Sequence, residues 1–140
     1  MRNGVVLNKL HALDEVLNEL RSLGKVTTGQ LQDDWRTRRA IERDLQVLVE
    51  IVVDVCQRII ALRNEAPAPT SAEAIERCIQ VGALSASDAY RKMAQFRNFI
   101  VHRYERVDVA ILVDVVNSRL PDFEGFRAEV LAYEKSQIQP

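Results

Sequence analysis

The chain has 140 residues, of which 47% are hydrophobic and 28% charged, and its formal net charge is −1. This length suits one domain with one core, and a nearly neutral chain gives no global signal for binding nucleic acid or a membrane surface. The sequence has no long apolar leader and no run near the ~18 apolar residues of a membrane span. We therefore expect a cytoplasmic protein with a single domain, residues 1–140.

Two amphipathic helices are predicted in the first half of the chain, because apolar residues recur there at alternating steps of four and three. Gly24 lies just beyond the first helix and is a natural stop. The second helix has two adjacent apolar stripes, which predicts burial against more than one neighbour. The stripes are Val6, Leu10, Leu13, Leu17 and Leu20 in the first helix, and Ile41, Leu45, Leu48, Val52, Val55, Ile59 and Leu62 with Val49, Val53, Cys56 and Ile60 in the second.

Two shorter helices are predicted after a break at Pro67 and Pro69. Residues 70–73, Thr-x-x-Glu, form a capping-box pattern that opens the first of them, and Gly82 ends it. Residues 85–88, Ser-x-x-Asp, form a related polar cap for the next helix. Its expected buried face is Ala89, Met93, Phe96 and Ile100.

The segment 107–116 is rich in β-branched residues and resembles a strand in isolation. No second strand candidate exists to pair with it, so we predict a helix with Asp108 near its cap. Pro121 suits the first turn of a last helix that carries Phe123, Phe126 and Val130. The predicted fold is all-α, an antiparallel up-and-down bundle of about five to six helices.

The sequence predicts no metal and no cofactor. It has no Gly-rich phosphate loop, no HExxH motif and no metal-ligand cluster. Cys56 and Cys78 lie within apolar helical patterns and form no CxxC pair, so small core residues in a reducing compartment are favoured over a disulfide or a metal site.

The segment 97–104, RNFIVHRY, places one of only two histidines between arginines near the end of a predicted helix. If the helix stays regular, Arg97 and Tyr104 share one line at the edge of the buried face, because they are seven residues apart. Asn98 and His102 share another line. His102 then points roughly 150° away from the core. It is either an ordinary exposed histidine or part of a site.

Local basic clusters favour a site that contacts phosphate. Between residues 91 and 106, five basic residues face a single acid, Glu105, and we expect Arg91 and Arg103 to help bind RNA. A second basic run flanks Trp35, which either stacks on a base or packs at a helix start. Nearby acids can neutralise this second run. The second basic run comprises Arg36, Arg38, Arg39 and Arg43, and the acids near it are Asp33, Asp34, Glu42 and Asp44.

RNA can be cut without metal when a base takes the proton of a 2′-hydroxyl group, which then attacks the neighbouring phosphate. Histidine side chains titrate near neutrality, so His102 can act as general base or acid. Arg97 can hold the phosphate and stabilise the developing charge, and Asn98 can orient His102 or donate to a phosphate oxygen. One histidine cannot easily serve as both acid and base, so a two-fold dimer that joins two copies of the segment is favoured.

The pattern Arg-x4-His-x-Tyr, in the setting MAQFRNFIVHRYERVD followed by LPDFEGF, resembles the HepT group of the HEPN superfamily. These are small all-helical RNases paired with nucleotidyltransferase antitoxins. The resemblance extends from RRAIERDLQVLVEIVVDV to the final helix. It implies a metal-independent RNase homodimer with Arg97 and His102 as catalytic residues and Asn98 in support. Tyr104 is similar to the tyrosine that the antitoxin modifies with AMP to silence the toxin.

Two alternatives to a ribonuclease toxin stay open at this point. One is a non-catalytic HEPN binding subunit that presents substrate or nucleotide to a nucleotidyltransferase partner. The other is a structural helical dimer in which segment 97–104 closes the bundle. Cleavage of RNA by the purified protein, with and without a His102→Ala substitution, distinguishes the ribonuclease toxin from both alternatives.

Overall fold

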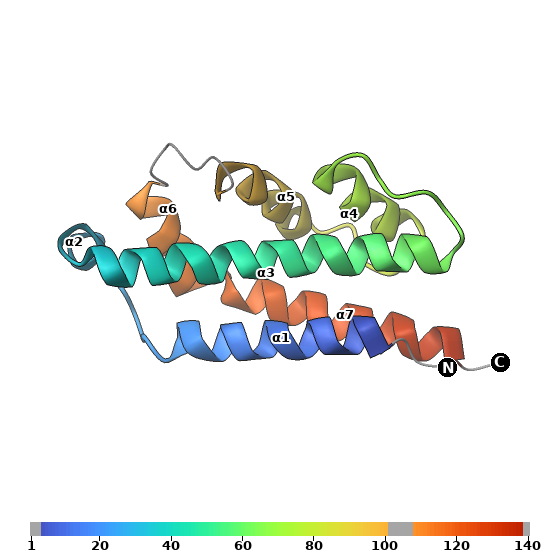
Figure 1. Ribbon diagram of the computed structural model, residues 1–140, viewed down its shortest axis with the longest axis horizontal. Helices are drawn as coiled ribbons and strands as arrows, with labels where there is room; N and C mark the ends of the chain where they lie inside the picture. The colour runs from blue at the N-terminus through green and yellow to red at the C-terminus, as the bar shows by residue number, and fades with distance from the viewer. Residues whose placement is uncertain (1–3, 101–107, 139–140) are drawn as a thin grey trace.

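The computed structural model describes residues 4–100 and 108–138, and within them every regular element is a helix (Figure 1). The predicted all-α class is therefore confirmed. The last three elements follow one another without a break and form one helical run. The elements are α1 Gly4–Arg21, α2 Thr28–Asp33, α3 Trp35–Leu62, α4 Ser71–Gln80, α5 Asp88–Ile100, α6 Val109–Asp114, the π-helical η1 Val115–Arg119 and α7 Leu120–Ile138.

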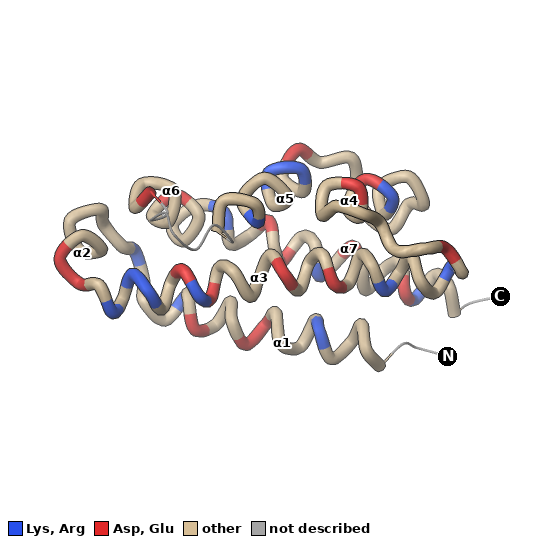
Figure 2. Tube along the Cα trace, turned by 45° about the horizontal axis from the view of Figure 1, so that its top comes forward, with Lys and Arg blue, Asp and Glu red and all other residues tan. Residues whose placement is uncertain are grey.

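Helices α1, α3, α5 and α7 alternate in direction along the chain, so the up-and-down arrangement is also confirmed (Figure 1). α3 runs through the middle and packs against α1, α4 and α5. The start of α1 and the end of α7 lie at one end of the bundle, while α2, α6 and the first turns of α3 lie at the other (Figure 1). Basic and acidic residues are interspersed along the helices (Figure 2).

The hydrophobic core follows the predicted stripes closely. All five stripe residues of α1 are buried, and α3 is buried on two sides because α1 lies on one of them and α4 and α5 lie on another. The prediction for Leu62 is wrong, since its side chain is 49% exposed, and Val53 of the second stripe is only half-buried. Leu62 is the last residue of α3, and the chain then turns away through Asn64, whose φ of 62° is positive.

Helix ends were predicted in part. The Thr70 hydroxyl accepts from the Glu73 backbone N–H at 3.1 Å, which is half of the expected capping box. The Glu73 carboxylate instead accepts from Arg77 at 3.3 Å. Gly82, with φ +83°, ends α4 in the left-handed conformation that favours glycine. Asp108 caps α6 as predicted, by accepting from the backbone of its second residue.

The predicted cap of α5 is wrong by two residues. The Ser87 hydroxyl caps the helix by accepting from the Ala89 backbone N–H at 3.2 Å. The Ser85 backbone N–H and hydroxyl instead donate to Glu129 on α7. Glu129 also accepts from the Tyr90 phenol, and burial together with this carboxylate raises the pKa of Tyr90. Tyr90 is 2% exposed and belongs to the core. Ala89, which the apolar pattern predicts on the buried face, is only half-buried.

The sequence did not predict α2. It has six residues and a single buried one, Leu31, so it is too short to show helical periodicity. Tertiary contacts hold this region, because α2 packs on α3 and α6. The preceding loop is fixed by two reciprocal hydrogen bonds between the Val26 backbone and the Asn117 side-chain amide, at 3.0 and 2.9 Å.

Pro121 lies in the first turn of α7 as predicted, but that helix does not begin at a chain break. Proline cannot donate a backbone hydrogen bond, and its ring crowds the preceding turn. The π-helical turn η1 stands immediately before Leu120 and Pro121. A wider turn at this point lets the chain pass from α6 into α7 without ending the helix.

Cys56 and Cys78 are both free and buried, which confirms their prediction as core residues. The Cys78 thiol donates to the Cys56 carbonyl at 3.6 Å. Proximity of the Cys78 thiol and burial raise the pKa of Cys56 well above its usual value. A thiol held neutral in this way is a poor nucleophile.

The contact between α1 and α3 includes a pair of carboxyl groups whose protonation should set part of the pH dependence of stability. Partial burial and the hydrogen bond with Glu19 raise the pKa of Asp44 to about 6. Because the folded state holds this proton more tightly than the unfolded chain, stability falls as pH rises from about 4 through 6. We expect Asp44→Asn to stabilise the protein by about 1 kcal/mol at pH 7.5, after allowance for solvent screening, and by much less at pH 4.5.

Thermal unfolding at the two pH values measures this effect. Asp54→Asn is the matched control on α3, because Asp54 is exposed and pairs with Lys9 across the surface at 3.3 Å. A lower midpoint for Asp44→Asn than for the unmodified protein at pH 7.5 would show that the carboxyl pair is not repulsive.

Candidate functional site

Helix α5 carries the described part of the candidate site. Arg91, Arg97 and Asn98 lie on this helix, which the structure describes as far as Ile100. His102, Arg103 and Tyr104 lie outside the described residues. The geometry of the site therefore rests on the last two turns of α5 and on the elements around them.

Arg97 is half-buried at the edge of the α5 core face. Met93 and Ile100, one turn before and after it, are both buried, and this spacing brings the stem of Arg97 against apolar neighbours. Its Nε atom is buried and has no hydrogen-bond partner among the described residues. Leaving a buried donor unpaired costs about 1–3 kcal/mol, and Arg97 also forms no ion pair with any described carboxylate. As far as residues 4–100 and 108–138 are concerned, its guanidinium is available to an anion.

Asn98 and Phe99 project from the same turn into solvent. Asn98 is exposed, as expected for a side chain that supports a surface site. Phe99 is 59% exposed, which makes it one of the few large apolar side chains left outside the core. An aromatic side chain of this exposure beside polar residues is typical of a contact surface.

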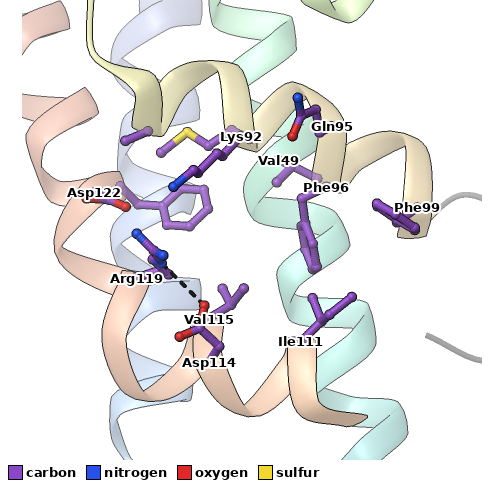
Figure 3. Close-up of a pocket in the computed structure, with 13 residues that line it drawn as sticks. Val49, Lys92, Gln95, Phe96, Phe99, Ile111, Asp114, Val115, Arg119 and Asp122 are labelled. Atoms are coloured by element: carbon purple, nitrogen blue, oxygen red, sulfur yellow. Dashed lines mark hydrogen bonds and ion pairs between the residues drawn. The ribbon is translucent and has the colours of Figure 1, made fainter. Parts of the chain in front are cut away.

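Phe99 lies at one end of a groove of about 210 Å³ between α5 and the α6–η1–α7 run (Figure 3). Its wall includes Phe96, Ile111 and Val115. At its rim, Arg119 donates to Asp114 at 3.3 Å (Figure 3). An apolar wall with an internally paired rim suits contact with apolar groups better than with phosphate.

Arg91 does not join Arg97. Its Nε and Nη2 atoms donate to the two carboxylate oxygens of Glu76 on α4, at 2.6 and 3.5 Å. This contact raises the pKa of Arg91 and ties α5 to α4. The two arginines are six residues apart on a regular helix, so they lie about 120° apart around its axis. A role for Arg91 in binding RNA stays a prediction, and it would require the pair with Glu76 to open.

Comparison with known proteins identifies the group to which this arrangement belongs. A family model described as Ribonuclease HepT-like matches residues 13–130. The chain belongs to the Ribonuclease HepT-like family. It is 24% identical over 126 residues to the mRNA nuclease HepT of Shewanella oneidensis, and the alignment covers 89% of this chain and 94% of that protein. The family resemblance drawn from the sequence is confirmed.

Solved structures show the same HepT-like fold. The tri-AMPylated Shewanella oneidensis HEPN toxin in complex with MNT antitoxin matches with a TM-score of 0.81 and 23% identity, over 93% of this chain and 98% of that one. The cytosolic protein YutE from Bacillus subtilis matches with a TM-score of 0.79 and 15% identity, over 100% of this chain and 97% of that one. At these identities the likeness concerns the fold.

Sequence reasoning missed two features of this HepT-like site, the groove and the exposure of Phe99. The signal for Phe99 was present, because an aromatic residue follows Asn98 at a position outside the apolar stripe of Phe96 and Ile100. The groove had no signal in the sequence, since it depends on how the π-helical turn brings Val115 and Arg119 toward α5.

Three further observations concern the described part of the HepT-like chain. His11 is exposed and lies 3.0 Å from Glu15 one turn later, which agrees with the surface position expected for it. No group of three or more His, Cys, Asp or Glu within residues 4–100 and 108–138 is placed to hold a metal ion. No helix in those ranges is long and apolar enough to cross a membrane.

Proposed function

We propose that this chain is a metal-independent endoribonuclease toxin of a type VII, HepT/MntA-like toxin–antitoxin system, acting in the cytoplasm as one domain of residues 1–140. It cleaves RNA through the Arg-x4-His motif formed by Arg97 and His102. The observation that supports this most is the lack of a described hydrogen-bond partner for the Arg97 Nε atom, in a chain of the HepT-like family. The Arg97 side chain is half-buried at the end of α5.

The proposed reaction is attack of a ribose 2′-oxygen on the adjacent phosphorus. His102 takes the proton of the 2′-hydroxyl as general base, and the bond to the 5′-oxygen of the next nucleotide breaks. That oxygen leaves with a proton from a general acid, and the products are a 2′,3′-cyclic phosphate and a 5′-hydroxyl end. Arg97 holds the phosphate and stabilises the extra negative charge of the transition state. Asn98 and Arg103 support RNA binding.

A homodimer provides the second proton-transfer group. With one motif histidine in each chain, two chains that meet near segment 97–104 supply both a base and an acid to one cleft. Phe99 supports this arrangement, because its 59% exposed ring sits beside Asn98, where a second protomer can cover it. Fully burying a side chain of this size contributes about 1.5–3 kcal/mol.

The proposed partner is a cognate nucleotidyltransferase antitoxin that silences the toxin by AMPylation of Tyr104. The Tyr104 oxygen attacks the α-phosphorus of ATP, pyrophosphate leaves, and the phenolic proton passes to a base. The other two tyrosines of the chain are engaged elsewhere. Tyr90 is 2% exposed and donates to Glu129, and the Tyr133 hydroxyl accepts from Arg63 at 3.5 Å. The phosphate placed on Tyr104 would compete with RNA for basic side chains.

Cleavage of RNA by purified protein in the presence of EDTA tests the activity. We expect the unmodified protein to cut RNA with EDTA present, leaving 2′,3′-cyclic phosphate ends. His102→Ala should lose about 10²–10⁴-fold in rate, the usual contribution of a positioned acid or base. His11→Ala is the matched control, because it removes the chain's other histidine from the exposed surface of α1.

The alternatives predict different outcomes in the same assay. A non-catalytic HEPN binding subunit binds RNA or nucleotide without cleaving it, in both the original and the His102→Ala form. A cleavage activity that EDTA removes would show that metal participates. Equal cleavage by the original protein and the His102→Ala variant would reject the role of this histidine.

A further inference from the structure

The only tryptophan of the chain is not part of its core. Trp35 opens α3 and its side chain is 60% exposed, the highest fraction among the large apolar residues described. The Arg36 guanidinium lies over its ring at 5.4 Å from the centroid. This cation–π contact occupies one side of the indole, and the exposed fraction leaves much of the remaining ring to solvent. Packing at the helix start therefore does not explain this residue.

Basic residues continue along the same side of α3. Arg36, Arg39 and Arg43 are spaced by three and four residues, so they share a face over two turns, about 10 Å. Trp35 falls within the same sector, 40° from Arg39 and 80° from Arg43 at about 100° per residue. We call Trp35 and these three arginines the Trp35 surface. Figure 2 shows basic and acidic positions alternating over these turns.

The acids of this segment are largely committed to other contacts. Asp34 caps α3 by accepting from the backbone N–H groups of Arg36 and Thr37. Glu42 lies 3.6 Å from the buried Arg38 and 3.4 Å from Arg39. Asp44 lies beside the Glu19 carboxyl of α1 and forms a side-chain hydrogen bond with it.

Two cations of the Trp35 surface form no close ion pair with a described carboxylate. Among the described residues, Arg36 and Arg43 form no ion pair, while Asp33 remains as an exposed acid at the end of α2. Two guanidinium groups without a close ion pair therefore share one helix face with a solvent-exposed indole, and the nearby carboxylates of Asp34 and Asp44 act on them through charge attraction alone.

The position of this surface in the fold relates it to the candidate site. α5 runs toward the end of the bundle where α2, α6 and the first turns of α3 lie (Figure 1). α6 packs on both α2 and α3. A single-stranded RNA bound near the end of α5 can therefore extend along this end of the bundle toward the Trp35 surface.

We propose that the Trp35 surface is a second RNA-contact site, where Trp35 stacks on an unpaired base and Arg36 and Arg43 hold flanking phosphates of a single-stranded segment. The inference rests on the proposed ribonuclease function and extends it to the class of substrate. An exposed aromatic platform with adjacent guanidinium groups matches single-stranded RNA, because its bases are free to stack and its backbone is charged. Stacking is tolerant of sequence, so the surface would add affinity with little base preference.

Intrinsic fluorescence provides a direct test, because Trp35 is the only tryptophan. The probe is a 2′-O-methylated single-stranded oligonucleotide of about 12 nucleotides, a length within the usual site size of such surfaces. Because its 2′-oxygens are methylated, they cannot attack the neighbouring phosphates, and the probe is not cleaved. We expect the oligonucleotide to quench Trp35 emission with the same midpoint as its binding measured by anisotropy.

Trp35→Ala should weaken binding roughly tenfold, the size of one lost base stack, and Trp35→Phe should restore part of it. Arg43→Ala should weaken binding and reduce the slope of log affinity against log salt by about 0.7, as expected for one lost phosphate contact to a single strand. The matched controls are Arg58→Ala and Leu62→Ala, exposed residues at the other end of α3, which should change neither quantity.

The outcomes separate this inference from the function on which it rests. Equal affinity of Trp35→Ala and the original protein, without quenching, overturns the RNA-contact site even if the protein cleaves RNA. Loss of nucleotidyltransferase binding by Trp35→Ala with unchanged RNA affinity overturns it in favour of a protein contact. A chain that neither binds nor cleaves RNA rejects both the site and the proposed function.

Discussion

Replacing Arg97 by methionine is expected to lower the rate of RNA cleavage by about 10²–10³-fold, the loss typical of removing one donor that stabilises a charged transition state. Methionine keeps the apolar stem that packs at the edge of the α5 core face and removes the guanidinium. Arg97→Lys keeps the charge without the planar pair of donors, so we expect it to recover only part of the rate. Single-turnover cleavage with EDTA present measures both effects.

Arg97→Met should leave the thermal stability of the protein unchanged or increase it. In the described structure the Arg97 Nε atom is buried without a partner, so methionine removes an unsatisfied donor and breaks no described hydrogen bond. A strong loss of activity with equal or higher thermal stability is the signature of a group retained for function. Arg58→Met on α3 is the control, because Arg58 is exposed and forms no ion pair with a described residue. A large drop in the melting temperature of Arg97→Met would instead indicate that Arg97 serves the fold.

Tyr104→Phe is expected to prevent silencing by the antitoxin. The substitution removes the phenolic oxygen that would bond to the α-phosphorus, and it keeps the aromatic ring. After co-expression with the cognate nucleotidyltransferase, we expect the original chain to gain the mass of one or more AMP groups and to lose cleavage activity. Tyr104→Phe should keep its original mass and its activity, and should inhibit growth even with the antitoxin present. Intact-mass measurement and the cleavage assay on the same samples check both expectations.

The two described tyrosines supply the controls for this experiment. Tyr133→Phe removes a hydroxyl that accepts from Arg63 at the surface, and this variant should be modified like the original chain. Tyr90→Phe removes the buried hydroxyl that donates to Glu129, so it should lower stability by about 1 kcal/mol or more without changing the modification. Full AMPylation of Tyr104→Phe would place the modification on another residue.

The helices that the sequence predicted well are those whose periodic pattern is long. α1 and α3 show several consecutive apolar steps, and each step adds to a signal that only a helix satisfies. The six residues of α2 contain one buried side chain and give no such signal. The start of α5 was misplaced for a related reason, since Ser85 and Ser87 are equally good caps in the sequence. Glu129, more than 40 residues away, accepts from Ser85 and leaves Ser87 to cap the helix.

The motif Arg-x4-His-x-Tyr was visible in the sequence, because histidine and tyrosine are rare in this chain and the spacing of the motif is local. The electrostatic state of its members was not. Arg91 and Arg97 are the same residue type on one helix, yet Arg91 is bound to Glu76 and the Nε of Arg97 is buried without a described partner. Trp35 was equally ambiguous until its exposure showed that it does not pack in the core.

The amino-acid sequence alone determined the all-helical class, the long helices, the core stripes and the family to which the chain belongs. These properties depend on side-chain type and on spacing within one element, which are written in the chain order. Only the tertiary structure decided which charges are paired, where the groove between α5 and η1 lies, and which aromatic residues stay in solvent. Those properties depend on contacts between elements that are distant in sequence, and no local pattern encodes such contacts.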